Sequence, residues 1–316
     1  MNRFTLLRRE QLYGKSQLEV FKKIGVEAKL TDFDILTGAF ICNISYDIRT
    51  DEVTYIDNYI KDLTGWYWTS NVNNNGNVET VSFNGLSGNR YCEGREGGIR
   101  PVLYYSSFSE ILNKANRSFT NNGVLEIEYG YYPQTVASSK LQKELTDNFG
   151  KLKKTENTYT IDGISSKEYE KSFLPTIINE YEYNGKRYVR VKANSSFING
   201  KFKLSNGCEY KNGELVWVEV QPVEWLVSKE NDMLIAKNIV CSGVQYHNNT
   251  NLNNFAESNM HNYIDRYLFR DIFQRLYPGL NKGPYYEYRD SSDFNDKNNK
   301  KFNSLVKKLV RERKAK

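Results

Sequence analysis

The sequence predicts an α+β fold rich in β-strands, with short flanking helices and a basic amphipathic helix at the C-terminus. Short runs of alternating apolar and polar residues indicate the strands, and turn residues separate these runs. Helical spacing of apolar residues occurs only in short stretches. With 316 residues, of which 39% are hydrophobic and 26% charged, the chain is long enough to bury a core.

Residues 1–110 form the first predicted unit, which begins with two short helices. Ser16 and Glu19 have the spacing of a capping box ahead of an apolar run. Thr31 followed by Asp32 is typical of the start of a second helix. We therefore expect two helical segments before the first strands.

Strands complete this unit. Residues 64–70 alternate as a strand, an asparagine-rich turn follows at residues 73–77, and residues 78–83 return as a second strand. Residues 99–105 are largely apolar and are expected to form a buried closing strand.

The second predicted unit spans residues 124–290 and follows a polar linker at residues 111–123. Its first strand begins at Val124, and Ser258 has the position of an N-cap for a late helix. Its other elements are a helix at 141–149 and strands at 181–193, 215–220, 223–228 and 232–240.

Residues 291–316 form a basic tail. From Lys297 to Lys316 there are nine basic residues and one acidic residue, a net charge of +8. Because the whole chain carries +6, the preceding residues carry about −2 and predict no cationic groove. Apolar residues recur at helical spacing in the tail, so an amphipathic helix is expected, packed on the body or bound to an acidic partner.

Cysteine and histidine are too sparse for a structural metal centre. The four cysteines form no CxxC pair, and only two histidines occur, His247 and His261. We therefore expect no metal and no cofactor. The N-terminus lacks the apolar core of a signal peptide and no stretch has the length of a membrane span, so a cytoplasmic protein without membrane contact is predicted.

Two blocks of sequence resemble known families. Residues 65–70, rich in tryptophan, and residues 97–103, Gly-Gly-Ile-Arg-Pro-Val-Leu, resemble the end of a C-type-lectin-like domain. The group is the one shared by formylglycine-generating enzymes and hypervariable phage and retroelement receptor-binding proteins. Residues 128–135, 222–227 and 258–273 resemble the front half of an uncharacterised bacterial domain family with a similar lectin-like end.

The order of these blocks departs from the families, because the end-like block comes first. Two arrangements remain open: two incomplete modules, or one permuted module in which both halves form a single core. We favour two packed units. The catalytic cysteines of formylglycine-generating enzymes have no motif match here, so the resemblance implies lectin-like modules without that oxidase chemistry.

Several residues in these blocks are expected in the core. Trp66 and Trp68 lie on one face of their strand and Tyr67 on the other, and the resemblance places the tryptophan face inside. Arg100 precedes an apolar run, so it must be paired or extend to water. Trp225 is also expected in the core.

The polar loops between residues 71 and 95 combine asparagine, tyrosine and arginine, a mixture enriched at recognition surfaces. We interpret the chain as a non-catalytic, mobile-element-encoded binding protein that recognises a protein, or a glycan, through these loops. The expected binding residues are Asn71, Asn73, Asn74, Asn75, Asn77, Asn84, Asn89, Arg90, Tyr91 and Arg95. A common alternative role for polar loops is that of solvated turns.

The second functional hypothesis assigns recognition to the tail. A phage-type inhibitor or accessory protein of a defence nuclease complex would contact RNA or DNA through its basic residues. The residues expected to do so are Lys300, Lys301, Lys307, Lys308, Arg311 and Arg313. Catalysis is not expected, because no phosphate-binding or nucleophilic motif occurs in its structural context.

Overall fold

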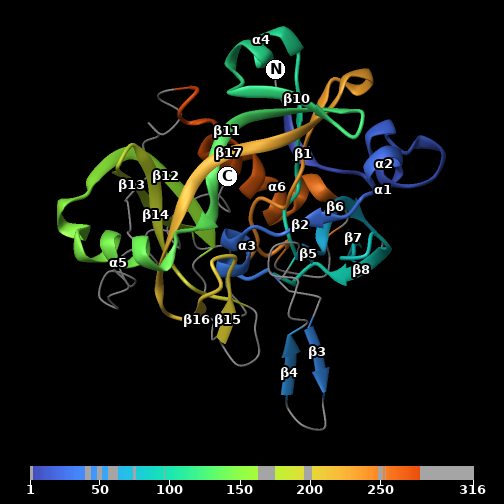
Figure 1. The fold of residues 1–316 in the computed structure, drawn as a ribbon. Helices are drawn as coiled ribbons and strands as arrows, with labels where there is room; N and C mark the ends of the chain where they lie inside the picture. Colours follow the sequence, from blue (N-terminus) through green and yellow to red (C-terminus); the bar gives the residue numbers. More distant parts are fainter. Residues whose placement is uncertain are drawn as a thin grey trace, which may run out of the picture.

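A central antiparallel sheet organises the molecule (Figure 1). The structure is a computed structural model that describes residues 3–39, 44–47, 52–55, 63–73, 76–95, 97–162, 175–195, 201–247, 252 and 254–277. Within these residues, nine strands join in one sheet, and several short helices and smaller sheets surround it. The prediction of a β-rich α+β fold is therefore confirmed. The predicted basic tail lies outside the described residues.

Two long strands hold the central sheet together. β11 (Val124–Val136) and β17 (Leu215–Ser228) pair along most of their length and run side by side in Figure 1. Their register is interrupted near Gly130, whose φ of +77° suits glycine. A Cβ at Gly130 would also meet the side chain of Ile272. The bulge therefore lets a helix pack closely on β11.

Two groups of strands continue the sheet from opposite ends of β17. β14 (Lys186–Lys192) pairs with the first part of β17, and β18 (Met233–Ala236) pairs with the last part. The remaining strands of the sheet are β12 (Lys153–Asp162) and β13 (Pro175–Tyr183) beyond β14, β9 (Pro101–Tyr104) and β1 (Arg3–Leu6) beyond β18, and β10 (Arg117–Asn121) beside β11.

The prediction that residues 111–123 form a polar linker is wrong. Helix α4 (Phe108–Lys114) ends in this stretch, and β10 forms a hairpin with β11 through a turn at Asn122 and Gly123, both with positive φ. The sheet also joins the two predicted units, because β9 pairs with β18. Strand pairing and burial in the core, rather than the polarity of its residues, determine the structure of this segment. Ile111 of α4, for example, is buried.

The helices near the N-terminus follow the prediction with one correction. Helix α3 (Asp32–Thr37) has the predicted cap, since the side chain of Thr31 accepts from the N–H of Asp34. Helix α2 (Glu19–Ile24) forms, but its N-cap is Leu18 and not the predicted Ser16. Leu18 is buried and its N–H donates to Gln11 over 2.9 Å, so core packing sets the start of this helix.

The remaining helices cover the sheet. α6 (Asn259–Tyr263) and α7 (Phe269–Phe273) continue through a π-helical segment at Ile264–Leu268, and Ser258 caps α6 as predicted. Phe273 of α7 lies against Phe4 of β1, with ring centroids 6.2 Å apart. The other helices are α1 (Arg9–Leu12) and α5 (Ser139–Asp147).

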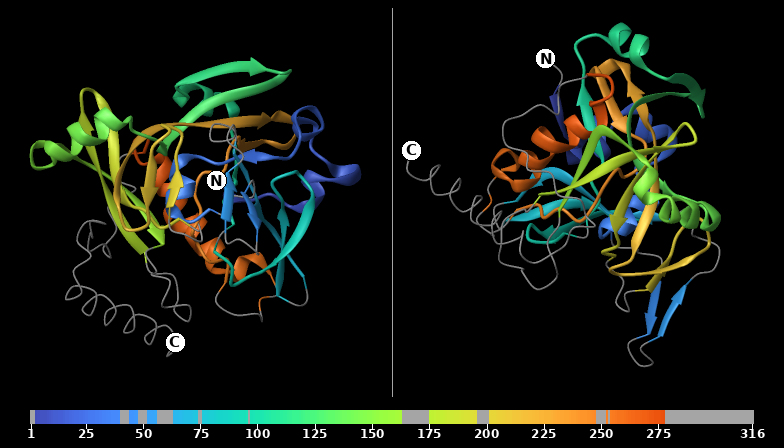
Figure 2. Two further views of the ribbon diagram at one scale, coloured as in Figure 1. Left: turned by 60° about the horizontal axis from the view of Figure 1, so that its bottom comes forward. Right: turned by 90° about the vertical axis from the view of Figure 1, so that its left-hand side faces the viewer.

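Smaller sheets surround this centre. They are β2 (Ala28–Lys29) with β5 (Thr64–Gly65), β3 (Ile44–Asp47) with β4 (Glu52–Tyr55), β15 (Lys201–Lys203) with β16 (Glu209–Lys211), and the three strands β6 (Tyr67–Val72), β7 (Asn77–Val81) and β8 (Ser87–Tyr91). Figures 1 and 2 show the β6–β8 sheet on the side of the molecule away from β12–β14.

Candidate functional site

The β6–β8 sheet is fixed to the core by its first strand. Trp66 and Trp68 are buried on one face, with ring centroids 4.8 Å apart, and Tyr67 is buried on the other. The prediction that the tryptophan face lies inside is confirmed. Because both faces of this strand are covered, neither can serve as a recognition surface.

The two parts of the predicted lectin-like block meet in space. The N–H of Trp68 donates to the carbonyl of Gly98 over 3.0 Å, and the N–H of Gly98 donates to Trp66 over 2.9 Å. A Cβ at Gly98 would lie 2.6 Å from the side chain of Ile239, so this close approach requires glycine. The strand that precedes the loops is thus anchored to the segment that follows them.

Arg100 completes this anchor. Its guanidinium is buried and donates to the carbonyls of Ala236 and Val26, each over 2.8 Å, and to the hydroxyl of Tyr67. Among the described residues it forms no ion pair. The prediction that Arg100 is structural is confirmed, and so is the burial of Trp225.

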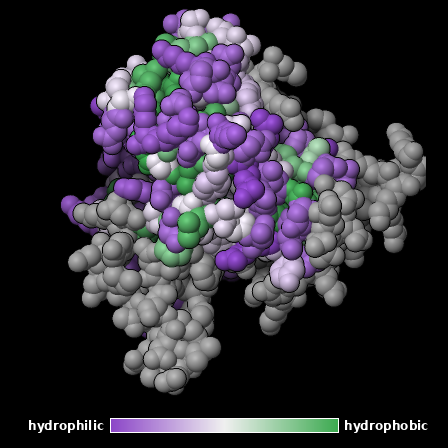
Figure 3. All heavy atoms as spheres, turned by 90° about the vertical axis from the view of Figure 1, so that its right-hand side faces the viewer, coloured by the Kyte–Doolittle hydropathy of each residue, from purple (hydrophilic) through white to green (hydrophobic). Residues whose placement is uncertain are grey.

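The edge strand of this sheet and the turn before it carry exposed apolar side chains. Tyr91 is 72% exposed, Leu86 63% and Phe83 37%, all within β8 or the turn that precedes it. Figure 3 views the molecule from this side and shows a mostly hydrophilic surface interrupted by small hydrophobic patches. Large exposed apolar side chains amid polar residues are typical of interaction sites.

The structure places most of the predicted binding residues on this sheet or beside it. Those it describes are Asn71, Asn73, Asn77, Asn84, Asn89, Arg90, Tyr91 and Arg95. Asn74 and Asn75 lie outside the described residues. In β8, Asn89, Arg90 and Tyr91 are all exposed, so they are available to a partner.

Several of the asparagine side chains form hydrogen bonds that stabilise the protein's own structure. The amide oxygen of Asn73 accepts from the N–H of Asn77 over 3.0 Å. That of Asn71 accepts instead from the N–H of Arg9 over 2.7 Å, so it joins β6 to the start of α1. The amide oxygen of Asn84 accepts hydrogen bonds from within its own turn. The contacts of Asn73 and Asn84 are what asparagine side chains provide in turns, so their amide oxygens contribute to loop conformation.

The two arginines differ in their surroundings. Arg90 is exposed and lies over the ring of Trp66, 5.6 Å from its centroid. Arg95 is tied to the body of the protein, because its guanidinium donates to Gln245 over 3.3 Å and its carbonyl accepts from Gly243. Arg90 is therefore the more accessible cation of this surface.

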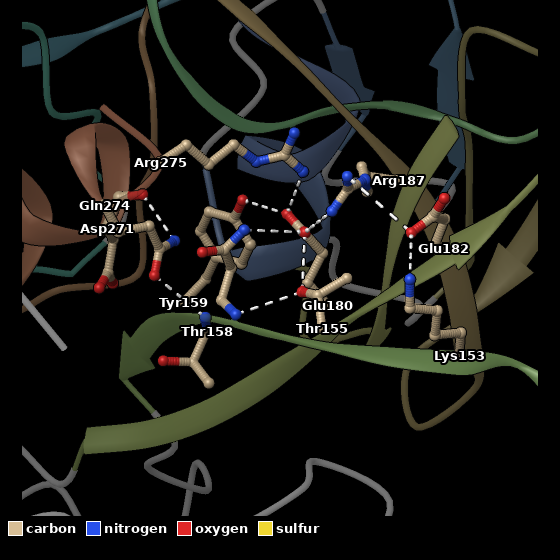
Figure 4. Close-up of polar contacts among 11 residues, drawn as sticks. Lys153, Thr155, Thr158, Tyr159, Glu180, Glu182, Arg187, Asp271, Gln274 and Arg275 are labelled. Atoms are coloured by element: carbon tan, nitrogen blue, oxygen red, sulfur yellow. Dashed lines mark hydrogen bonds and ion pairs between the residues drawn. The ribbon is translucent and has the colours of Figure 1, made fainter. Parts of the chain in front are cut away.

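A second polar cluster lies at the far end of the central sheet, around Glu180 of β13 (Figure 4). The carboxylate of Glu180 is fully buried and accepts from five side chains. The donors are Thr155, Asn157 and Tyr159 of β12, Arg187 of β14 and Arg275 after α7.

This cluster is a network of hydrogen bonds and ion pairs that stabilises the fold. Burial by itself raises the pKa of Glu180, but the charge of Arg275 and the surrounding hydrogen bonds outweigh it and hold the pKa below its ordinary value. The carboxylate is therefore ionised at neutral pH and its oxygens are engaged. It fixes the end of α7 to the sheet and offers no proton for acid catalysis.

Sequence reasoning missed Glu180 although a signal existed. Glu180 follows Ile177, Ile178 and Asn179 in a strand, and a charge inside an apolar strand must find partners. The same argument identified Arg100. Its partners could not be named, because Arg275 lies far away in the sequence.

The two histidines have separate environments. The side chain of His247 is half-buried, and burial lowers its pKa from the ordinary value. His261 contacts the ring of Phe255, with centroids 5.2 Å apart. Within the described ranges, no group of three or more His, Cys, Asp or Glu side chains is arranged to hold a metal ion.

The comparisons with known proteins give no match. No protein-family model matches the chain, and neither does any curated protein or solved structure. None of the helices in the described part of the chain has the length and apolar character needed to cross a membrane.

Proposed function

We propose that this chain is a non-catalytic binding protein that recognises a partner protein through β8 and the turn before it. The observation that carries the proposal is the exposure of Phe83, Leu86 and Tyr91 along β8 and the turn before it, with Arg90 also exposed on this strand. Tyrosine and arginine are enriched at protein interfaces. Leu86 favours a protein over a glycan, because its side chain offers nothing to sugar hydroxyls.

A lectin-like fold for the region around this surface is part of the proposal. Gly98, in the Gly-Gly-Ile-Arg-Pro segment, pairs with the tryptophan-rich strand, and the loops lie between the two in the sequence. This pairing gives the loops a rigid base. Rigid support lowers the entropic cost of binding, which suits a recognition module.

The test is affinity capture from the native cell with matched variants. The site variant combines Leu86→Ser with Tyr91→Ser, and the control combines Leu112→Ser with Leu215→Ser, which are exposed apolar residues elsewhere. We expect proteins that the parent and the control capture and the site variant does not. If the site variant captures the same proteins as the parent, the proposal is wrong.

The nucleic-acid hypothesis depends on the tail, whose residues 297–316 carry a net charge of +8. Binding of this kind releases counterions and weakens steeply as salt rises, whereas capture through apolar side chains does not. Repeating the capture over a range of salt concentrations therefore separates the two functions.

A further inference from the structure

Strand β8 lies at the open edge of its sheet. The order of strands is β6-β7-β8, and among the described residues β8 pairs with β7 alone. Four of its five residues are exposed. An edge strand presents unpaired N–H and C=O groups, to which another extended chain can bind.

The hydrogen bonds of the β7–β8 hairpin show which groups face outwards. Ser82 donates its N–H to the carbonyl of Leu86 over 2.8 Å, and the antiparallel register continues from this pair. Ladder hydrogen bonds alternate along an antiparallel pair. The N–H groups of Ser87, Asn89 and Tyr91 therefore point away from β7.

At another edge of the protein, side chains hydrogen-bond to the outward backbone groups of the strand. At the edge of β12, the N–H of Thr158 donates to the side chain of Gln274, and the N–H of Thr160 donates to Asp271. The hydroxyl of Tyr263 donates to the carbonyl of Thr160 over 2.9 Å. Helix side chains thus take the place of a neighbouring strand at β12. At β8 the described residues engage only carbonyls in this way: Arg90 donates to that of Asn89 over 3.4 Å, and the N–H of Gly94 donates to that of Tyr91.

Charge distinguishes β8 from β10, which is also an edge strand. Arg117 of β10 is 3.9 Å from the carboxylate of Glu128 across the hairpin. Arg90 is the one formal charge on β8, and within the described ranges it forms no ion pair. Its guanidinium is held over Trp66, so it is positioned to meet an acidic side chain on an added strand.

We propose that β8 binds an extended peptide segment of the partner as a fourth strand of this sheet. The outward N–H groups of Ser87, Asn89 and Tyr91 supply main-chain hydrogen bonds, as in other cases of strand addition. An acidic side chain of the segment pairs with Arg90, and an apolar side chain on the opposite face contacts Tyr91. This inference rests on the proposed function and specifies its mode of binding.

The experiment selects linear peptides from a displayed random library and compares variants. Asn89→Pro removes an outward N–H, which an edge strand tolerates, while Asn89→Ala retains it. Ser118→Pro is the matched control, because the tight turn of the β10–β11 hairpin turns the N–H of Ser118 outwards in the same way. Arg90→Glu tests the charge, and thermal melting confirms that each variant is folded.

We expect selected peptides rich in Asp or Glu that bind the parent, Asn89→Ala and Ser118→Pro, with at least a tenfold loss for Asn89→Pro. Selection on Arg90→Glu should favour basic peptides instead. In the parent, bound peptide should slow amide exchange at Ser87, Asn89 and Tyr91, a readout that does not depend on the proline variant folding.

Two results would overturn the inference: peptides that bind Asn89→Pro as tightly as the parent, or unchanged exchange at the outward amides. Slow exchange at these amides without peptide, together with a concentration-dependent dimer, would assign the edge to a second copy of the chain and also refute it. If the serine site variant loses its partner while Asn89→Pro keeps it, strand addition fails and the proposed function stands.

Discussion

The guanidinium of Arg100 donates to the hydroxyl of Tyr67 over 3.1 Å, and that hydroxyl donates to the carbonyl of Val26 over 2.6 Å. A cation is thus held in the core by carbonyl and hydroxyl oxygens in place of a carboxylate. The rings of Phe21 and Tyr67 lie 5.1 and 5.3 Å from the guanidinium carbon. Together with the hydrogen bonds from Arg100 to the carbonyls of Ala236 and Lys237, these contacts join the N-terminal segment, β6 and the end of β18.

Replacing Arg100 with Met should destabilise the fold strongly. The substitution keeps an unbranched side chain of similar length but removes the guanidinium donor from the buried carbonyl of Ala236 and leaves that of Val26 with Tyr67 alone. An unpaired buried group costs about 1–3 kcal/mol. We expect a loss of about 3–5 kcal/mol in the free energy of unfolding, measured by denaturant titration. Tyr67→Phe should cost less, about 1–2 kcal/mol, because it removes a hydroxyl and keeps the ring.

A double-mutant cycle supplies the control for this pair. If Arg100 and Tyr67 act through their shared hydrogen bond, the two losses should combine to less than their sum. Losses that add fully would mean that the bond contributes little. An unchanged midpoint for Arg100→Met would contradict its role as an anchor.

The sequence predicted local elements better than their assembly. Thr31 and Ser258 carry short-range capping signals, and both cap helices as expected. The linker prediction failed because polarity describes residues 111–123 locally, whereas pairing with β11 decides their structure. Long-range pairing of this kind leaves no periodic signal in one sequence.

The sequence predicts the candidate site only in part, because composition does not show which side chains are exposed or already hydrogen-bonded. Composition indicated the loops at residues 71–95, and Tyr91 and Arg90 are indeed exposed there. Composition does not show that the amide oxygen of Asn73 is already used in its own turn. Leu86 was not selected, because a single leucine in sequence is far more often buried than exposed.

Glu180 should make the protein sensitive to acid. Because the pKa of this carboxyl is lower in the folded chain than its ordinary value, its stabilisation is present above the ordinary pKa and is lost as pH falls through the folded one. Glu180→Gln should lower stability at neutral pH, by about 3–5 kcal/mol as for a broken buried ion pair, and should flatten the decline below about pH 4.

The control for this variant is Glu182→Gln. Glu182 is partly exposed and lies 3.5 Å from Lys153 and 3.9 Å from Arg187, so its loss should cost no more than about 1 kcal/mol. Both variants are compared by thermal melting across the acid range. Equal losses in the two variants would show that burial gives Glu180 no special weight.

Asp34 should have the opposite pH dependence. Burial raises its pKa to about 7, against hydrogen bonds from Thr31 and Ser242 that lower it, while the neighbouring charge of Asp32 raises it further. Because the folded chain holds this proton above the ordinary pKa of aspartate, the stabilisation is complete below about pH 4 and is lost as pH rises towards 7. The slope can reach about 1.4 kcal/mol per pH unit in that window.

Asp34→Asn isolates this contribution. Asparagine keeps an oxygen that can accept from the N–H of Thr31, which now donates to Asp34 over 2.7 Å, but it cannot ionise. The free energy of unfolding of parent and variant should therefore be measured from pH 4 to pH 8, and the difference between them should shift in favour of the variant as pH rises. Taking the difference cancels the contribution of Glu180, which both proteins share. A difference that stays constant across this range would show that Asp34 does not change its protonation there on folding.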